Sequence, residues 1–431
     1  MKLPRPLRRT LFWIHLVLGV AAGVVIALLC FTGAALAFQD DIEGWAEASL
    51  RRVEVPPAPA ERLTIDEVVA AAREQEPELA ITAVEVARKP EQAWRIIVGR
   101  RDARWVNPYT GELLVAAHPE RVEGWHRFFN WNLRLHRWLL QEGESRSTGS
   151  AINGLANLAF LGLALSGLLL WWPASLRALR GVSLFNRKAR GKARDFNWHN
   201  VIGFWCLLPL VVMIVTGVYF SYNWGRNLTD TLLGASPALI LPEGGVATLR
   251  RGGPPLSLEE RFTIAVRAFP RWETLRLPAA SGRASADGRG RGQGGGGGRG
   301  RGGPGSAGGG HNHGGGGHNH GGGGGRNPFA IRVEESGFTL LHIPSQILIH
   351  PRTGEILDTL SPDSLTLRQK LRTSIRSLHT GEAGRFAGKL IAFLACLGGL
   401  LLVYTGFALS IRRLARNLSG KKRKTEMRET A

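Results

Sequence analysis

The chain has 431 residues, of which 44% are hydrophobic and only 21% are charged, a balance that leaves room for membrane spans beside two or three domains. Its formal net charge is +21, but the lysines and arginines gather beside apolar runs and in one glycine-rich segment. The charge therefore does not indicate a nucleic-acid partner. All three cysteines fall inside apolar runs, which excludes a disulfide framework, and none belongs to a Cys-x-x-Cys motif.

Four apolar runs have the length of about 20 residues that a hydrocarbon core about 30 Å thick requires, namely residues 11–38, 150–172, 199–222 and 386–411. We interpret the first run as an anchor, because it is longer than the apolar region of a signal peptide. Lysine and arginine gather in residues 1–10, 173–198 and 412–431. By the positive-inside rule these segments face the cytoplasm. We therefore expect a multi-pass protein of a bacterial inner membrane with both termini in the cytoplasm.

Two large segments, residues 39–121 and 223–366, then lie in the periplasm, and each has the pattern of a small α+β module. Helical periodicity occurs at residues 63–73 and 258–269, and strand-like alternation occurs at residues 80–86, 94–98, 331–333 and 339–342. Each module is followed by a segment that we expect to form one helix at the membrane surface, residues 122–149 and residues 367–385. The first of these is rich in aromatic residues, which settle at membrane interfaces.

The second module is interrupted by residues 282–326, which are rich in glycine and arginine. Such a composition cannot bury a core, so we expect this insert to be disordered. It contains two His-Asn-His patterns, formed by His311, His313, His318 and His320. These imidazoles would bind Cu, Ni or Zn ions weakly; the alternative is a flexible insert with incidental histidines.

Histidines near the ends of the spans recur at matched offsets. His15 is followed after 4, 17 and 18 residues by glycine, threonine and glycine, and His199 is followed at the same offsets by the same residues. A Thr-Gly-Glu sequence also begins 26 residues before His136 and 26 residues before His379. These spacings predict two tandem copies of one unit, in which a span, a soluble cap and a second span follow each other.

Equivalent positions of such a duplicated membrane protein lie at the same depth. We therefore expect His15 to face His199 near the cytoplasmic side and His136 to face His379 near the periplasmic side. Two imidazoles from different helices form the axial ligands of a b-type haem, so the four histidines predict two haems. Zinc is the alternative metal, but a zinc site requires three or four ligands. A further alternative is that these histidines are interfacial or helix-packing residues without a ligand. Small hydroxyl side chains in the spans are candidates for hydrogen bonds to the imidazoles: Thr32, Thr216, Ser166 and Thr405.

The remaining ordered histidines have no histidine at the equivalent position of the other half. We expect them to be surface or cap residues rather than ligands. They are His118, His126, His342 and His350.

The motifs around the four histidines are similar to those of a known family. They read Trp13-Ile-His15, Leu135-His136-Arg137, Trp198-His199-Asn200 and Leu378-His379-Thr-Gly-Glu382. Together with the paired Thr-Gly-Glu turns, they resemble the PepSY-associated transmembrane family, iron-regulated inner-membrane proteins that include bacterial ferric-siderophore reductases. The resemblance covers nearly the whole chain outside residues 282–326.

The resemblance implies a membrane α-helical four-span bundle of two tandem repeats, with α+β PepSY-like cap modules in the periplasm. It further implies a di-haem b oxidoreductase that passes electrons from the cytoplasmic side to a periplasmic ferric chelate, as in siderophore iron uptake. The chain has no flavin-binding pattern, so we expect a separate cytoplasmic or membrane electron donor. The substrate is expected near the outer haem, beside Arg137, Glu382 and Arg385.

Two alternatives belong to other functional classes. One is a non-enzymatic metal-uptake accessory protein, in which the caps and the His-Asn-His insert capture ions. The other is a haem-free scaffold whose PepSY-like caps bind or inhibit a periplasmic protease.

Overall fold

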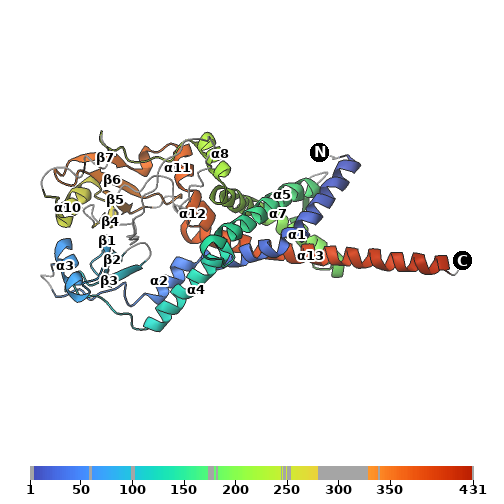
Figure 1. Ribbon diagram of the computed structural model, residues 1–431, viewed down its shortest axis with the longest axis horizontal. Coiled ribbons are helices and arrows are strands. Elements are labelled where there is room, and N and C mark those ends of the chain that lie inside the picture. Colours follow the sequence, from blue (N-terminus) through green and yellow to red (C-terminus); the bar gives the residue numbers. More distant parts are fainter. Residues whose placement is uncertain are drawn as a thin grey trace, which may run out of the picture.

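A computed structural model of the chain describes residues 4–57, 61–98, 102–172, 183–243, 254–279, 329–337 and 340–429, together with the single positions 179, 180, 245 and 249. The glycine-rich insert at 282–326, with His311, His313, His318 and His320, lies outside the described residues. The molecule has two parts, a bundle of long helices and a sheet region at one end of it (Figure 1).

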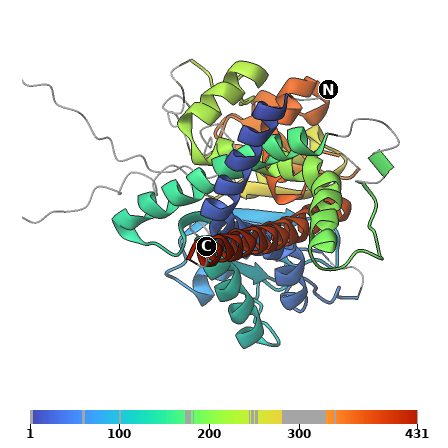
Figure 2. The ribbon, with the colours of Figure 1, turned by 90° about the vertical axis from the view of Figure 1, so that its right-hand side faces the viewer.

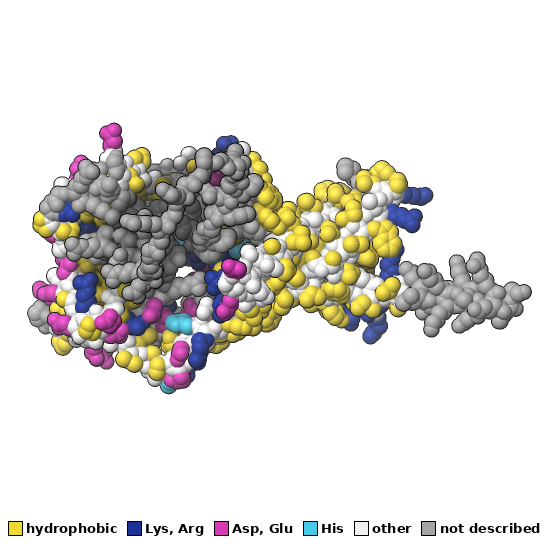
Figure 3. Space-filling model, viewed as in Figure 1, with side chains coloured by type: hydrophobic (Ala, Val, Ile, Leu, Met, Phe, Trp, Pro, Cys, Tyr) yellow, Lys and Arg dark blue, Asp and Glu magenta, His cyan; other side chains and the backbone are white. Residues whose placement is uncertain are grey.

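Four helices of the described chain are long and apolar enough to cross a membrane, and they coincide with the four spans expected from the sequence. They are α1 (Arg5–Leu36), α5 (Arg146–Trp171), α7 (Gly191–Ser221) and α13 (Arg385–Glu429). Each of them packs against two of the others, in the cyclic order α1, α5, α7, α13, and Figure 2 shows the bundle end on. Hydrophobic side chains cover its outer surface, as a membrane requires, and lysines and arginines gather at the end away from the sheet (Figure 3).

The sheet region is built around one antiparallel sheet of seven strands in the order β3-β2-β1-β4-β5-β6-β7. The strands are β1 (Ile81–Ala87), β2 (Trp94–Val98), β3 (Asp102–Val106), β4 (Trp272–Pro278), β5 (Ala330–Glu335), β6 (Ser345–Ile349) and β7 (Ile356–Leu360). The first three come from the segment after α1 and the last four from the segment after α7. Strands β1 and β4 pair with each other, with Val84 opposite Leu277, so the two expected modules share one sheet.

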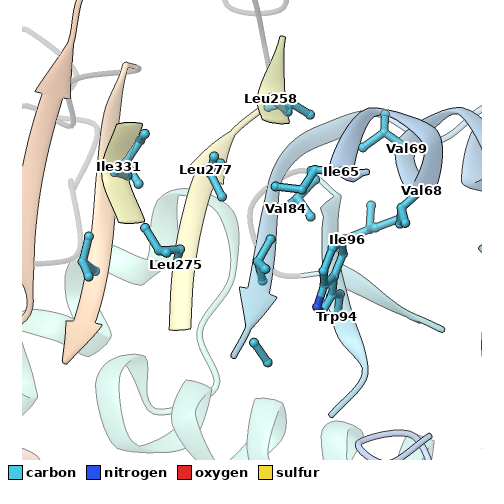
Figure 4. Close-up of a cluster of buried hydrophobic side chains, with 14 of the residues drawn as sticks. Ile65, Val68, Val69, Val84, Trp94, Ile96, Leu258, Leu275, Leu277 and Ile331 are labelled. Carbon is cyan, nitrogen blue, oxygen red and sulfur yellow. The ribbon is translucent and has the colours of Figure 1, made fainter. Parts of the chain in front are cut away.

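Two helices, α3 (Ile65–Gln75) and α10 (Leu258–Ala268), cover one face of the sheet. Their apolar sides and the inward-facing side chains of the strands form the core of this region, shown in Figure 4. Each helix begins with a capping box, Thr64 with Glu67 and Ser257 with Glu260. The two helix starts also cap each other, because Asp66 accepts from the amide of Glu259 while a Glu259 carboxylate oxygen accepts from the amide of Ile65.

The sheet is attached to the bundle at both of its sides. On the β2 side, Arg52 of the segment that follows α2 (Gln39–Ala46) forms a β-bridge with Gln92. On the β5–β6 side, the carbonyl of Leu341 accepts hydrogen bonds from the hydroxyls of Ser374 and Ser377. The sheet therefore stands over the end of the bundle that carries His136 and His379.

Four local expectations differ from the structure. Residues 122–149, expected as one helix, are divided, because α4 (Pro119–Trp138) ends where Leu139 takes a positive φ of 50°, and α5 begins at Arg146. Residues 367–385, expected as one helix, form two short helices, α11 (Leu367–Thr373) and α12 (Ile375–Thr380), because the backbone leaves helical geometry at Ser374. Residues 340–342, expected in a strand, form a turn in which His342 has a positive φ of 43°. Strand β4 was not expected, because its alternation of apolar and polar residues is short and ends in Pro278.

Candidate cofactor site

Four histidines from four different helices form two pairs inside the bundle. His15 of α1 and His199 of α7 have ring centres 6.2 Å apart, with the ring planes at 84°. His136 of α4 (Pro119–Trp138) and His379 of α12 have ring centres 6.4 Å apart, with the planes at 63°. We call the first the distal pair and the second the sheet-side pair.

The spacing of both pairs suits one metal ion between two imidazoles. A ligating nitrogen lies about 2.0 Å from its metal, and the centre of the ring lies about 1.1 Å behind that nitrogen, so two axial imidazoles on one iron have centres about 6.2 Å apart. The observed 6.2 and 6.4 Å match this separation.

Each ring of the distal pair is fixed by a hydroxyl on the partner span of its own half of the chain. His15 Nδ1 lies 2.9 Å from Ser166 Oγ on α5, and His199 Nδ1 lies 2.8 Å from Thr405 Oγ1 on α13. Both hydroxyls donate to the carbonyl four residues earlier in their helices, at 2.6 Å for Ser166 and 2.7 Å for Thr405.

The sheet-side pair has the same arrangement. His136 Nδ1 lies 2.7 Å from Thr32 Oγ1 on α1, and His379 Nδ1 lies 2.9 Å from Thr216 Oγ1 on α7. Thr32 donates to the carbonyl of Leu28 at 2.6 Å, and Thr216 donates to the carbonyl of Val212 at 2.7 Å.

These hydrogen bonds favour one tautomer in all four rings. A hydroxyl has one proton, and each of these hydroxyls gives it to a backbone carbonyl, so it accepts a hydrogen bond from the imidazole. Nδ1 therefore carries the ring proton, and Nε2, on the opposite side of the ring, keeps a free lone pair. A metal-binding histidine takes this form, with its other nitrogen donating to a neighbouring group.

Three of the four rings pack against glycines. A Cβ atom at Gly167 would lie 3.3 Å from Cε1 of His15, one at Gly406 3.7 Å from Cε1 of His199, and one at Gly33 3.6 Å from Cε1 of His136. A longer side chain at any of these positions would press against the imidazole. The glycines therefore let each of these rings lie close to the backbone of the helix that it packs against.

Two further glycines let the chain turn back sharply after each sheet-side histidine. Helix α4 ends at Trp138, and a Cβ at Gly149 of α5 would lie only 2.0 Å from the Trp138 carbonyl oxygen. In the other half, a Cβ at Gly388 of α13 would lie 1.7 Å from the carbonyl oxygen of Ala383. No other residue permits these backbones to come so close, so both glycines place a histidine beside the bundle.

Zinc lacks the ligands that it requires. Within the part of the chain that the structure describes, no group of three or more histidine, cysteine, aspartate or glutamate side chains is placed to hold a metal ion. The structure thus offers sets of two imidazoles, which is the ligand number of a bis-histidine haem.

The four other histidines that the structure describes lie outside the pairs, three of them exposed and His350 half-buried. Each exposed ring lies near a carboxylate. A ring nitrogen of His126 lies 3.0 Å from a carboxylate oxygen of Glu47, and the corresponding distances are 3.5 Å from His118 to Glu120 and 3.6 Å from His342 to Glu334. His350 accepts from the amide of Thr353 in a turn at 3.2 Å.

The expected substrate residues lie next to the sheet-side pair in sequence and have partners within the protein. Arg137 lies over the ring of Trp138, at 4.7 Å from its centre. Arg385 donates to the carbonyl of Gly337 in the β5–β6 loop at 2.8 Å. Glu382 belongs to the turn between α12 and α13, where its carbonyl accepts from the amide of Arg385.

Sequence reasoning missed two asparagines that support the sheet-side pair. The amide of Asn132 donates to the carbonyl of Thr32 at 3.0 Å, and the amide of Asn153 donates to the carbonyl of His136 at 2.9 Å. Both side chains are buried, and a polar residue on the apolar face of a helix was the signal that would have identified them. They tie α4 and α5 to the residues that hold the His136 ring.

A family of membrane proteins matches nearly the whole chain. The family model described as the PepSY-associated TM region matches residues 12–413. No curated protein matches the chain. Since the match runs from the first span to the end of the fourth, the chain belongs to the PepSY-associated transmembrane family.

Proposed function

We propose that the protein is a di-haem b oxidoreductase of a bacterial inner membrane, which passes electrons from the cytoplasmic side to a ferric chelate in the periplasm. In this proposal the chain consists of two tandem repeats, and the sheet region is the PepSY-like cap. The observation that carries the proposal is the pairing of four imidazoles at 6.2 and 6.4 Å, each with Nδ1 engaged by a hydroxyl.

Haem b, when bound, supplies reversible one-electron chemistry. The chain's own residues would hold the group through Nε2 of His15 and His199 at the distal site, and through Nε2 of His136 and His379 at the sheet-side site. The hydroxyls keep each ring in the ligating tautomer, and hydrogen bonds to axial imidazoles also tune the potential of a metal centre.

The distribution of charge supports the direction of transfer. Arg194 and Arg412 lie at the end of the bundle beside the distal pair, where both contact the buried carboxylate of Asp195. Basic residues favour the cytoplasmic side of a membrane, so the distal pair receives electrons and the sheet-side pair faces the periplasm. The ferric chelate then docks near Arg137, Glu382 and Arg385, and the donor is a separate cytoplasmic or membrane component.

The optical spectrum and haem content of the purified protein test this proposal. We expect a sharp b-type α band after reduction with dithionite and two haems per chain. A metal-uptake accessory protein or a protease-binding scaffold would give no such band, and its absence would refute the oxidoreductase.

Single substitutions test the pairing. His15→Ala and His199→Ala should each remove the same haem and leave the other in place, and His136→Ala and His379→Ala should each remove the second haem. His126→Ala is the matched control, because His126 lies on α4 like His136 but has an exposed side chain that is hydrogen-bonded to Glu47. If members of one pair removed different haems, the ligand assignment would be wrong.

A further inference from the structure

Helix α8 (Asn223–Leu233) follows α7 directly and presents an apolar stripe outward. Trp224, Leu228 and Leu232 are spaced by one helical turn and therefore lie on one side of the helix. Their exposed fractions are 49%, 50% and 61%. A soluble surface rarely leaves three large apolar side chains in a row uncovered.

The other sides of α8 have different surroundings. Gly225 is buried against the end of α7, where a Cβ would lie 2.8 Å from the carbonyl oxygen of Val218. Arg226 donates to the carbonyl of Phe220 at 3.2 Å and so caps the last turn of α7. Asn223 and Asn227 are exposed. The helix thus has a protein side, a polar side and an apolar side.

The position of the stripe identifies what covers it. The span α7 ends at Ser221, and only Tyr222 separates it from α8, so the stripe begins at the boundary of the membrane. Phe220 in the last turn of the span is itself 40% exposed, and Figure 3 shows the apolar surface of the bundle continuing toward the place that α8 occupies in Figure 1. A tryptophan followed by leucines at this depth is typical of a helix lying in the membrane interface.

The other half of the chain supplies an internal comparison. The offset that relates His15 to His199 also relates Asp40, Gly44 and Ala48 to the three stripe residues of α8. These residues lie in and just after α2, the helix that follows α1. An aspartate, a glycine and an alanine form no apolar stripe, so the stripe belongs to the second half alone and is no general consequence of following a span.

Helix α8 is also connected to the sheet-side pair. Asp230 of α8 forms an ion pair of 2.7 Å with Arg372 of α11, whose side chain is only 6% exposed. Arg372 also donates to the hydroxyl of Tyr219 on α7 at 2.9 Å. Helix α11 leads through Ser374 into α12, which carries His379. The Asp230 side chain is 45% exposed, but Arg372 is buried, so breaking the pair would remove a partner from a buried charge and is unfavourable.

We propose that α8 lies in the lipid headgroup layer on the sheet side of the membrane, with Trp224, Leu228 and Leu232 inserted among the acyl chains, and that its link to Arg372 holds the α11–α12 segment at a fixed height above the bundle. The partner of this surface is the lipid bilayer. The lipid contact is independent of the proposed function; only the consequence for the haem ligand His379 rests on it.

Spin labels on single cysteines test the lipid contact in nanodiscs of phosphatidylcholine and phosphatidylglycerol. With the label at Leu228→Cys, collisions with oxygen should exceed collisions with a water-soluble Ni(II) chelate, and with the label at Asn227→Cys the order should reverse. The unsubstituted protein, with its cysteines inside the bundle, gives the background. Equal Ni(II) accessibility at both sites would place the stripe in water, and shielding of Leu228→Cys from both reagents would indicate a second protein copy; either result overturns the proposal.

A second label tests the connection without use of haem. The double substitution Leu228→Glu and Leu232→Glu should increase the mobility of a label at Arg368→Cys on α11, whereas Asn227→Glu should leave it unchanged. A single symmetric peak in size-exclusion chromatography, as for the unsubstituted protein, shows that the double variant is folded. Unchanged mobility in the double variant would refute the link. A protein that shows both label results but binds no haem would refute only the proposed function.

Discussion

Replacing Thr32 by valine tests whether the hydroxyls orient the imidazoles. The change keeps the shape of a fully buried side chain and removes the oxygen that lies 2.7 Å from His136 Nδ1. A buried donor that loses its acceptor costs about 1–3 kcal/mol. Because about 1.4 kcal/mol corresponds to a tenfold change, we expect haem to bind the sheet-side pair roughly tenfold more weakly, within the roughly 10- to 100-fold range of substitutions next to metal ligands.

The distal pair provides the internal control. Thr32 and His15 lie 17 positions apart on α1, about 25 Å along a helix, so the distal haem should be retained. Haem retention is measured by titrating haemin into the depleted protein and recording the dithionite-reduced spectrum. Thr32→Ser keeps the hydroxyl and should behave like the unsubstituted protein, and Thr405→Val should weaken only the distal site. The reasoning is refuted if the serine and valine variants of Thr32 lose haem equally.

Two further predictions concern stability. Gly399→Ala should lower the free energy of unfolding of the bundle by about 1–3 kcal/mol, because its Cβ would lie 2.5 Å from Cys30 Sγ. Gly19→Ala should be nearly neutral, because the atom nearest to its Cβ would lie 3.6 Å away. Denaturation in mild detergent compares the two variants, and equal effects on stability would contradict the packing argument. The hydrogen bond that the His126 ring donates to the Glu47 carboxylate raises the pKa of His126 above its ordinary 6.5. A pKa that is raised in the folded state stabilises the protein at pH values below the unfolded-state pKa, and this stabilisation is lost as the pH rises through the folded-state pKa. His126→Gln should therefore lower the melting temperature more at about pH 6 than at about pH 8.5. A decrease in melting temperature that is the same at both pH values would show that the pair does not titrate in this range.

The sequence by itself determined the components of the bundle. The lengths of the apolar runs predicted the four spans, and matched offsets selected four of the twelve histidines. Thr32, Thr216, Ser166 and Thr405 were also expected as hydrogen-bond partners, because a small hydroxyl in a span is one of few side chains that can accept from an imidazole there. Such signals depend on residue type and spacing along the chain, which the sequence contains directly.

Only the tertiary structure decided how these components combine. Helix α1 contributes His15 to the distal pair and contributes Thr32 as the hydrogen-bond partner of His136 in the sheet-side pair. His15 and Thr32 each form a hydrogen bond with a residue more than one hundred positions away in the sequence. The joining of two modules through β1 and β4 was not expected, because strand pairing depends on neighbours across the sheet more than on local propensity. The division of residues 367–385 at Ser374 and the ion pair of Asp230 with Arg372 likewise depend on contacts between segments distant in sequence. Packing, which no local pattern encodes, therefore fixed the geometry of the site.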